Sequence, residues 1–322
     1  MYNSIMNKNI FVCVSVMAIL LCGCQAVKSE SQTRFVLDTV ATLTADCDKK
    51  TLDGAFDLCL SYEDILSKTV ATSDVAKLNN ATDFCEVSPD TKTVIEKAIY
   101  YCKLSGGRYD ITVYPLTSVW DFKNQIVPSK DEIAEALKNV DYESIEIDKN
   151  RINLNGKKID LGSIAKGYIA DKMTDYLKKQ GAKTGIVNLG GNVVVFGREY
   201  NVGIMKPFTE ENAAVIHIKD KSVVTSGIYQ RYIKKDGKIY HHVLDIKTGY
   251  GVENDLSGVT VIGGSSADCD ALSTVLLLLG KDEGLKTVNG IENFEAVFIT
   301  RDGKISLSKG LYYDKDNFIQ LK

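Results

Sequence analysis

Hydrophobic residues recur along the chain with two different periods, and these periods predict the order of helices and strands. A spacing near the helical repeat predicts helices over residues 51–67, 91–104, 130–140, 164–180 and 265–280. Alternating or β-branched runs predict strands over residues 35–45, 108–116 (ended by Pro115), 184–197, 213–220, 222–227, 240–249 and 296–303, with a hairpin and a third strand within 144–162. Helices and strands mix without strict alternation, which favours the α+β class, with mixed or antiparallel sheets and packed helices.

The N-terminus has a different pattern from the rest. Residues 10–21 form an unbroken apolar run, too short to cross a bilayer but of the length of a signal-peptide core. The following Leu-Cys-Gly-Cys resembles a lipobox, which predicts a signal over 1–23, lipid on Cys24 and a polar tether over 24–32. We therefore expect residues 33–322 to be one domain, anchored to the cell membrane on its extracytoplasmic face. An ordinary secretory signal cleaved nearby is the alternative.

The charge and the cysteine content of the chain argue against some classes of partner and site. The 322 residues include 39 basic and 42 acidic ones, for a net charge of −3, which argues against a nucleic-acid partner. Five cysteines remain beyond Cys24 with no CxxC spacing, so we expect free, buried thiols rather than a disulfide framework or a zinc site.

The segment 265–280 carries the first candidate chemistry. Ser265 and Asp268 form a helix-capping pattern, whereas Asp270 has no such structural role. On a helix, Asp270, Ser273 and Thr274 share one face, and three oxygens there suit a hard cation such as Mg²⁺. The alternative is that Asp270 only hydrogen-bonds within the first turn.

Two glycine-containing segments are candidate ligand contacts. Asp160 ends a predicted strand just before the helix that Ser163 is expected to cap, and backbone N–H groups at such a terminus can receive phosphate. Lys166 lies one turn further on, facing the same opening, although a tight turn with a surface lysine is equally compatible. Gly190-Gly191 either admits a flat ligand or turns a hairpin.

Two of the three histidines are adjacent, in YHHVLDIKTG. Strand alternation places His241 and His242 on opposite faces, so they have different roles. One of them can accept a proton from an attacking hydroxyl, because an imidazole titrates near neutral pH. A histidine satisfied in the core or at a sheet edge is the alternative.

Six segments together resemble the ApbE-type FAD:protein FMN transferases, which are often lipoproteins. In order they are YDITVYPLTSVW, IDLGSIAKGYIAD, VNLGGNV, VVTSGIYQR, YHHVLDIKTG and ADCDALSTVLLLLG, within residues 33–310. The resemblance implies an ApbE-like fold with the flavin site between two subdomains. It also implies Mg²⁺-dependent transfer of FMN from FAD to a threonine or serine of a target protein, with release of AMP. Typical targets are membrane redox subunits with a Ser/Thr-Gly-Ala-Thr-like motif.

The resemblance also assigns residues. It implies metal ligation by Asp270, Ser273, Thr274 and the backbone oxygen of Ser163, and it makes His242 the candidate general base, with His241 structural. The positions matching flavin-nucleotide contacts are Arg108, Tyr109, Asp110, Asp160, Lys166 and the backbone near Leu244, with Leu37 and Thr69 on the flavin side, where relatives often have Met and Tyr.

Two other functions use the same residues. An FAD pyrophosphatase would employ this site with water as the nucleophile and yield FMN and AMP. A tethered, non-catalytic flavin- or solute-binding lipoprotein would share the lipobox, but it leaves Asp270, Ser273 and Thr274 without a purpose.

Overall fold

The computed structural model describes residues 29–322, so the predicted signal peptide and Cys24 lie outside the described residues. A ten-stranded sheet forms the centre, with the path β1-β2-β6-β7-β8-β11-β12-β13. Its strands are β1 Glu30–Val36, β2 Thr39–Ala45, β6 Gly185–Leu189, β7 Asn192–Met205, β8 Asn212–Gly227, β11 Leu256–Gly263, β12 Glu295–Thr300, β13 Ile305–Leu307, β14 Leu311–Tyr313 and β15 Ile319–Leu321. All pairings are antiparallel except the short one between β15 and β8.

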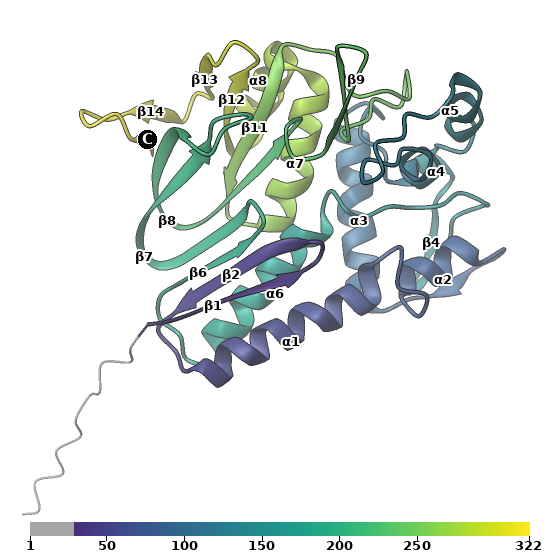
Figure 1. The fold of residues 1–322 in the computed structure, drawn as a ribbon. Helices are drawn as coiled ribbons and strands as arrows, with labels where there is room; N and C mark the ends of the chain where they lie inside the picture. Colours follow the sequence, from purple (N-terminus) through teal and green to yellow (C-terminus); the bar gives the residue numbers. More distant parts are fainter. Residues whose placement is uncertain (1–28) are drawn as a thin grey trace, which may run out of the picture.

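Helices cover one face of this sheet (Figure 1). They are α1 Lys49–Leu66, α6 Ala165–Lys179, α7 Ser266–Leu279 and α8 Lys281–Asn289. Helices α2 Asp74–Asn80 and α3 Pro89–Leu104 pack against α1 and α7, respectively. Helix α7 is buried along almost its whole length, because its leucine run packs inside the largest apolar cluster. A second cluster lies among the strands on the other face of the sheet. These observations confirm the α+β class.

A smaller region completes the molecule. It contains a three-stranded sheet of β3 Cys85–Glu86, β5 Arg151–Asn153 and β4 Glu146–Asp148, and a two-stranded hairpin of β9 Tyr232–Lys235 and β10 Lys238–His241. Helices α4 Tyr114–Val119 and α5 Lys130–Leu137 and the 3₁₀ turns η1 Ile111–Val113 and η2 Tyr142–Ser144 complete it. Helices α4 and α5 and the β9–β10 hairpin share their own apolar cluster, centred on Trp120.

Several sequence predictions are confirmed. All five long helices exist, the 144–162 segment contains the β4–β5 hairpin, and Gly181 ends α6 with a φ of 99°. Gly190 and Gly191 turn the β6–β7 hairpin with φ values of 63° and 102°, as the hairpin interpretation of this pair predicts. The five described cysteines are free, and four of them are buried.

Other strand predictions were wrong. Residues 35–45 are not one strand but parts of β1 and β2, because Leu37 and Asp38 turn the chain with positive φ. The 108–116 strand is absent: Asp110 accepts the Thr112 N–H and starts η1, and Pro115 lies in the first turn of α4 rather than ending a strand. The third strand expected within 144–162 is also absent.

Three further boundaries differ from the predictions. The segments 213–220 and 222–227 form one long strand, β8. Strand β10 ends at His241, so residues 242–249 leave the regular alternation that was expected. Strand β1 begins at Glu30, so the last residues of the expected tether belong to the sheet. Within residues 29–322 no helix combines the length and hydropathy needed to cross a membrane.

Candidate active site

The centre of the candidate site is a carboxylate at the crossing of α6 and α7. Asp270 is 5% exposed, and its Oδ2 accepts the Gly167 N–H at 2.9 Å. Burial raises the pKa of this carboxyl, while the nearby Lys166 charge and the Gly167 hydrogen bond act in the opposite direction. These two neighbours stabilise the ionised form only in part. A buried carboxylate of this kind is suited to bind a cation.

The crossing depends on the absence of a side chain at Gly167. A Cβ there would lie 2.2 Å from the Ser266 carbonyl oxygen and 2.8 Å from the Ala267 Cα, both backbone atoms of α7. Only glycine therefore lets α6 approach closely enough for its N–H to reach Asp270.

We expect Gly167→Ala to lower the free energy of unfolding by about 2–4 kcal/mol, because the two helices must move apart and Asp270 loses its donor. Chemical denaturation checks this. Gly264→Ala is the matched control, since an added Cβ there meets nothing within 4 Å. Equal stability of the two variants would contradict the expectation.

Two hydroxyls follow Asp270 on the same helix. The Ser273 and Thr274 side chains both donate back to the Asp270 carbonyl, at 2.9 and 3.4 Å. Ser226, at the end of β8, contacts the Ser273 hydroxyl at 2.7 Å and the Thr274 hydroxyl at 3.0 Å. The structure thus brings the three predicted side-chain ligands to one place and adds Ser226. No local pattern singles out Ser226, because its neighbours Ser273 and Thr274 lie 47 and 48 positions away.

The Ser163 prediction was partly wrong. Ile164, not Ser163, precedes α6 as its N-cap, without a side-chain cap hydrogen bond. The Ser163 hydroxyl instead contacts the Tyr109 hydroxyl at 2.8 Å, because the chain turns toward the core before the helix starts. In a regular helix the Gly167 N–H would bond to the Ser163 carbonyl. Here Ser163 precedes the N-cap, so its carbonyl has no partner within the helix, and the Gly167 N–H donates to Asp270 instead. That carbonyl is therefore available as a ligand.

Asp171 is a structural residue of the site that sequence reasoning missed. It lies one turn after Gly167 on α6, and it accepts hydrogen bonds from Ser266 N at 2.8 Å and Ala267 N at 3.0 Å. Its carboxylate also accepts the Ser265 hydroxyl at 3.2 Å. A carboxylate at this position satisfies the first free N–H groups of α7 and interacts favourably with the helix dipole. Asp171 therefore fixes the end of the helix that carries Asp270.

The two histidines differ as expected. His241 is 3% exposed, and its Nε2 donates to the Val252 carbonyl at 3.2 Å. His242 is half-buried, and its Nδ1 donates to the Arg231 carbonyl at 3.2 Å. A carbonyl only accepts, so the proton of His242 is on Nδ1 and its Nε2 carries a free lone pair. Burial lowers the pKa of each histidine to about 4, so the His242 ring is neutral at physiological pH.

The charge of Lys166 acts on both His242 and Asp270. Its positive charge lowers both the pKa of Asp270 and the pKa of His242, so its ammonium lies near both groups. The amide of Asn192 also lies against Asp270 and lowers its pKa, but its buried Nδ2 has no hydrogen-bond partner with good geometry among residues 29–322. A cation and an unpaired N–H donor beside one carboxylate can together receive an anionic oxygen.

Among the predicted nucleotide contacts, Asp160 and Arg108 are partly buried and form ion pairs. Asp160 pairs with Lys68 and accepts the Thr117 hydroxyl at 3.1 Å, and its other oxygen accepts the Gly162 N–H. Arg108 pairs with Asp245 at 3.2 Å, and its buried Nε has no partner among the described residues.

The other residues predicted to contact the flavin nucleotide are Asp110, Tyr109, Leu244, Leu37 and Thr69. Asp110 has both carboxylate oxygens occupied, by Thr112 and by the Tyr142 N–H, so its observed role is to hold the local backbone. Tyr109 and Leu244 are 3% and 7% exposed. Leu37 is partly buried in the β1–β2 turn, and Thr69 is exposed, with its hydroxyl 3.0 Å from the Ser67 hydroxyl.

The fold and the site together define a class of protein. A rigid helix crossing holds oxygen donors of the kind that a hard cation binds, with a lysine and a neutral histidine base beside them. Among residues 29–322 there is no cluster of three His, Cys, Asp or Glu side chains, which is compatible with Mg²⁺ because this ion keeps few protein ligands. These oxygen donors, the lysine and the histidine are the groups that an enzyme uses to transfer a group at phosphate.

Comparison with known proteins gives the family: the chain belongs to the ApbE family, whose model matches residues 37–298. An FAD:protein FMN transferase of Klebsiella pneumoniae is 35% identical over 271 residues, covering 81% of this chain and 85% of that protein. One of Treponema pallidum is 28% identical over 338 residues, covering 92% and 93%. The crystal structure of the ApbE protein of Thermotoga maritima aligns with a TM-score of 0.81 at 31% identity, covering 88% and 97% of the two chains. The flavin transferase ApbE of Vibrio cholerae aligns with a TM-score of 0.78 at 26% identity, covering 88% and 98%.

Proposed function

We propose that this protein is an FAD:protein FMN transferase. FAD is its substrate, and a threonine or serine hydroxyl of a target protein, in the Ser/Thr-Gly-Ala-Thr-like motif of an exported redox subunit, is the acceptor. The observation that carries the proposal is the neutral His242, with its free Nε2, beside the Lys166 and Asp270 region. The names of the relatives support the same activity.

The reaction balances with these residues. The acceptor oxygen attacks the phosphorus of the FMN half of FAD, and its proton passes to Nε2 of His242. The bond from that phosphorus to the bridging oxygen breaks, and AMP leaves with this oxygen. Lys166 and the Asn192 amide are suited to hold the phosphate oxygens while negative charge shifts to the leaving group.

We propose Mg²⁺ as the metal. Asp270, the Ser163 carbonyl and the hydroxyls of Ser273 and Thr274 would hold it, and Ser226 would orient those hydroxyls. When bound, the ion neutralises pyrophosphate charge and makes the phosphorus easier to attack. The fit rests on a donor set made only of oxygens and on the Ser163 carbonyl that lacks its helical partner.

Mass spectrometry tests the activity. A form of the chain beginning at Gln25 is incubated with FAD, Mg²⁺ and a threonine-bearing target fragment, beside a control without the fragment. A mass gain equal to FMN on the fragment, with AMP formed in step, supports the transferase. AMP and free FMN formed equally in both tubes would indicate an FAD pyrophosphatase, and bound FAD without AMP would indicate a non-catalytic flavin-binding protein.

We also propose that Cys24 carries lipid and anchors the enzyme to the extracytoplasmic face of the membrane. Only residues 25–29 separate Cys24 from β1. A segment of this length spans at most about 18 Å when fully extended. Cys24→Ala is expected to move the protein from the membrane pellet to the supernatant of fractionated cells, because the anchor is lost. A protein that stays in the pellet after this change would contradict the lipid anchor, and Cys59→Ala is the matched control.

A further inference from the structure

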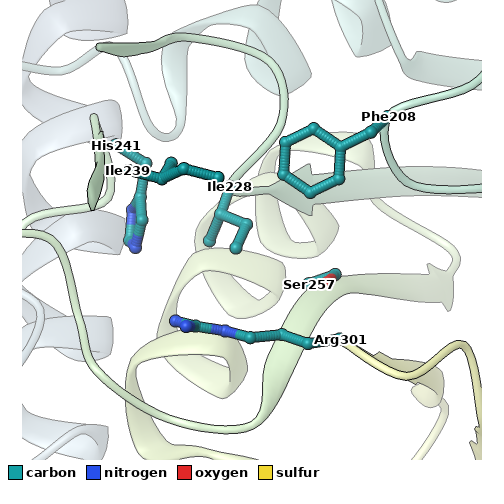
Figure 2. A pocket seen from close by; sticks show the side chains of 6 residues that line it. All are labelled: Phe208, Ile228, Ile239, His241, Ser257 and Arg301. Atoms are coloured by element: carbon teal, nitrogen blue, oxygen red, sulfur yellow. The ribbon is translucent and has the colours of Figure 1, made fainter. Parts of the chain in front are cut away.

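A pocket of about 210 Å³ lies against the β9–β10 hairpin, and none of the predicted metal or nucleotide ligands lines it (Figure 2). Its lining residues are Phe208, Ile228, Ile239, His241, Ser257 and Arg301. Arg301 extends along one side with its guanidinium group toward His241, while Phe208 lies at the far end. Apolar walls with a few polar groups are typical of a ligand pocket.

The polar groups of this pocket have unused bonding capacity. His241 donates through Nε2, so its buried Nδ1 is an acceptor, and it has no partner among residues 29–322. Arg301 forms no ion pair with any acidic side chain of the described residues. The pocket therefore offers a ligand one buried hydrogen-bond acceptor, the His241 Nδ1, and one cation, the Arg301 guanidinium.

The register of the hairpin decides which side chains join the pocket. Lys234 pairs with Ile239, and Tyr232 pairs with His241. Paired residues share a face, so Lys234 lies on the pocket face. Lys235 and Lys238 form the neighbouring pair, and the alternation of a strand puts them on the opposite face.

Charge and exposure mark this face as an interaction surface. Residues 231–238 contain four basic residues and one acidic residue, although the whole chain has a net charge of −3. Lys234 forms no ion pair within residues 29–322. Phe208 and Ile239 are 46% and 43% exposed beside it. Unpaired cations beside exposed apolar side chains favour an acidic partner with some apolar surface.

The pocket is also close to the reaction site along the chain. His241 in the pocket and His242 at the candidate reaction centre are consecutive, and both the His242 N–H and its ring bond to the Arg231 carbonyl at the base of the hairpin. Ile228 of the pocket follows Ser226 by two residues. The His242 ring, however, lies on the opposite face of the hairpin, with Tyr240, where Trp120 and Phe122 pack. A segment bound in the pocket is therefore one that flanks the acceptor hydroxyl, with the hairpin between the two.

We infer that the pocket face of the hairpin, with Lys234, Arg301, Phe208 and Ile239, docks an acidic segment of the target protein that flanks its acceptor hydroxyl. This inference rests on the proposed function. A peptide fits better than a phosphate ion, because it supplies acidic side chains for Lys234 and Arg301, backbone N–H groups for the His241 Nδ1 and apolar side chains for Phe208 and Ile239, whereas a phosphate ion has no apolar surface.

The test uses three synthetic peptides with the same central threonine motif and flanks of Asp, Asn or Lys. FMN transfer to each is measured for the wild-type chain, for K234E/R301E on the pocket face and for K235E/K238E on the opposite face. Both variants change the net charge equally. We expect the wild type to prefer the Asp peptide over the Asn peptide by about tenfold in kcat/KM, as two partly exposed charge pairs allow.

The expected result is a reversal of preference in K234E/R301E, which should favour the Lys peptide, with the wild-type order kept in K235E/K238E. Transfer to the Lys peptide also shows that the variant is folded. An unchanged preference in K234E/R301E, or an equal change in both variants, overturns the docking proposal while the transferase stands. Loss of binding to phosphatidylglycerol vesicles without a change in peptide preference would assign the face to the membrane instead. No transfer by the wild type to any peptide, with AMP still formed, would refute the transferase itself.

Discussion

His242→Ala is expected to reduce FMN transfer by about 10²–10⁴-fold while FAD still binds, because the acceptor hydroxyl loses the group that takes its proton. Among residues 29–322 the one hydrogen bond of the ring is to the Arg231 carbonyl, and its aromatic neighbour is Phe122, so its removal should leave the fold in place. Single-turnover transfer and FAD titration, measured on the same sample, separate the two effects. His241→Ala is an informative comparison: this buried ring packs against Gly251 and bonds to Val252, so its loss should lower stability more than chemistry.

The pH profile is part of the same prediction. Burial lowers the pKa of His242 to about 4 from an ordinary 6.5, so the base keeps its lone pair well below neutrality. Transfer should therefore be independent of pH around neutrality and fall only as the pH approaches 4, where the ring gains a proton. A fall in the transfer rate near pH 6.5 that is absent in His242→Ala would mean that the His242 ring is more exposed to water than it is in this structure. Retained transfer in His242→Ala at any pH would remove this residue from the mechanism.

Asp270→Asn is expected to lower Mg²⁺-dependent transfer by at least about 100-fold, because metal catalysis contributes several kcal/mol and about 1.4 kcal/mol is a factor of ten. Asparagine keeps an oxygen that can accept the Gly167 N–H, so the helix crossing survives and only the charge is lost. Asp270→Ala would instead leave that N–H unpaired in a buried place and add a stability cost of about 1–3 kcal/mol.

A second readout makes this prediction independent of activity. Mg²⁺ bound by the native state should raise the Tm of the wild type by an amount that grows with the logarithm of its concentration over Kd, and Asp270→Asn should lose the shift. Because burial raises the pKa of Asp270, the ion must displace a proton at low pH, so the shift should grow as pH rises. A Tm shift of equal size in both proteins would place the metal elsewhere.

The sequence determined the parts of this structure that depend on neighbouring residues. Helical periodicity located α7, and the Ser265 pattern located its start, because a cap acts within one turn. The spacing of Asp270, Ser273 and Thr274 placed three oxygens on one helix, since spacing on a helix is fixed by its pitch. The order of six motifs was enough to indicate the family that the comparison confirmed.

Only the tertiary structure decided what depends on residues far apart. The contact of Ser226 with Ser273, the cap that Asp171 gives to α7 and the pairing of Lys68 with Asp160 join elements that lie far apart along the chain. The start of α4 at Tyr114 and the end of β10 at His241 also followed from contacts, because the Trp120 cluster and the Asp110 turn override local alternation. Local periodicity reports which side of an element is buried, but not which element buries it, and that choice brought His242, Lys166 and Asp270 into one region.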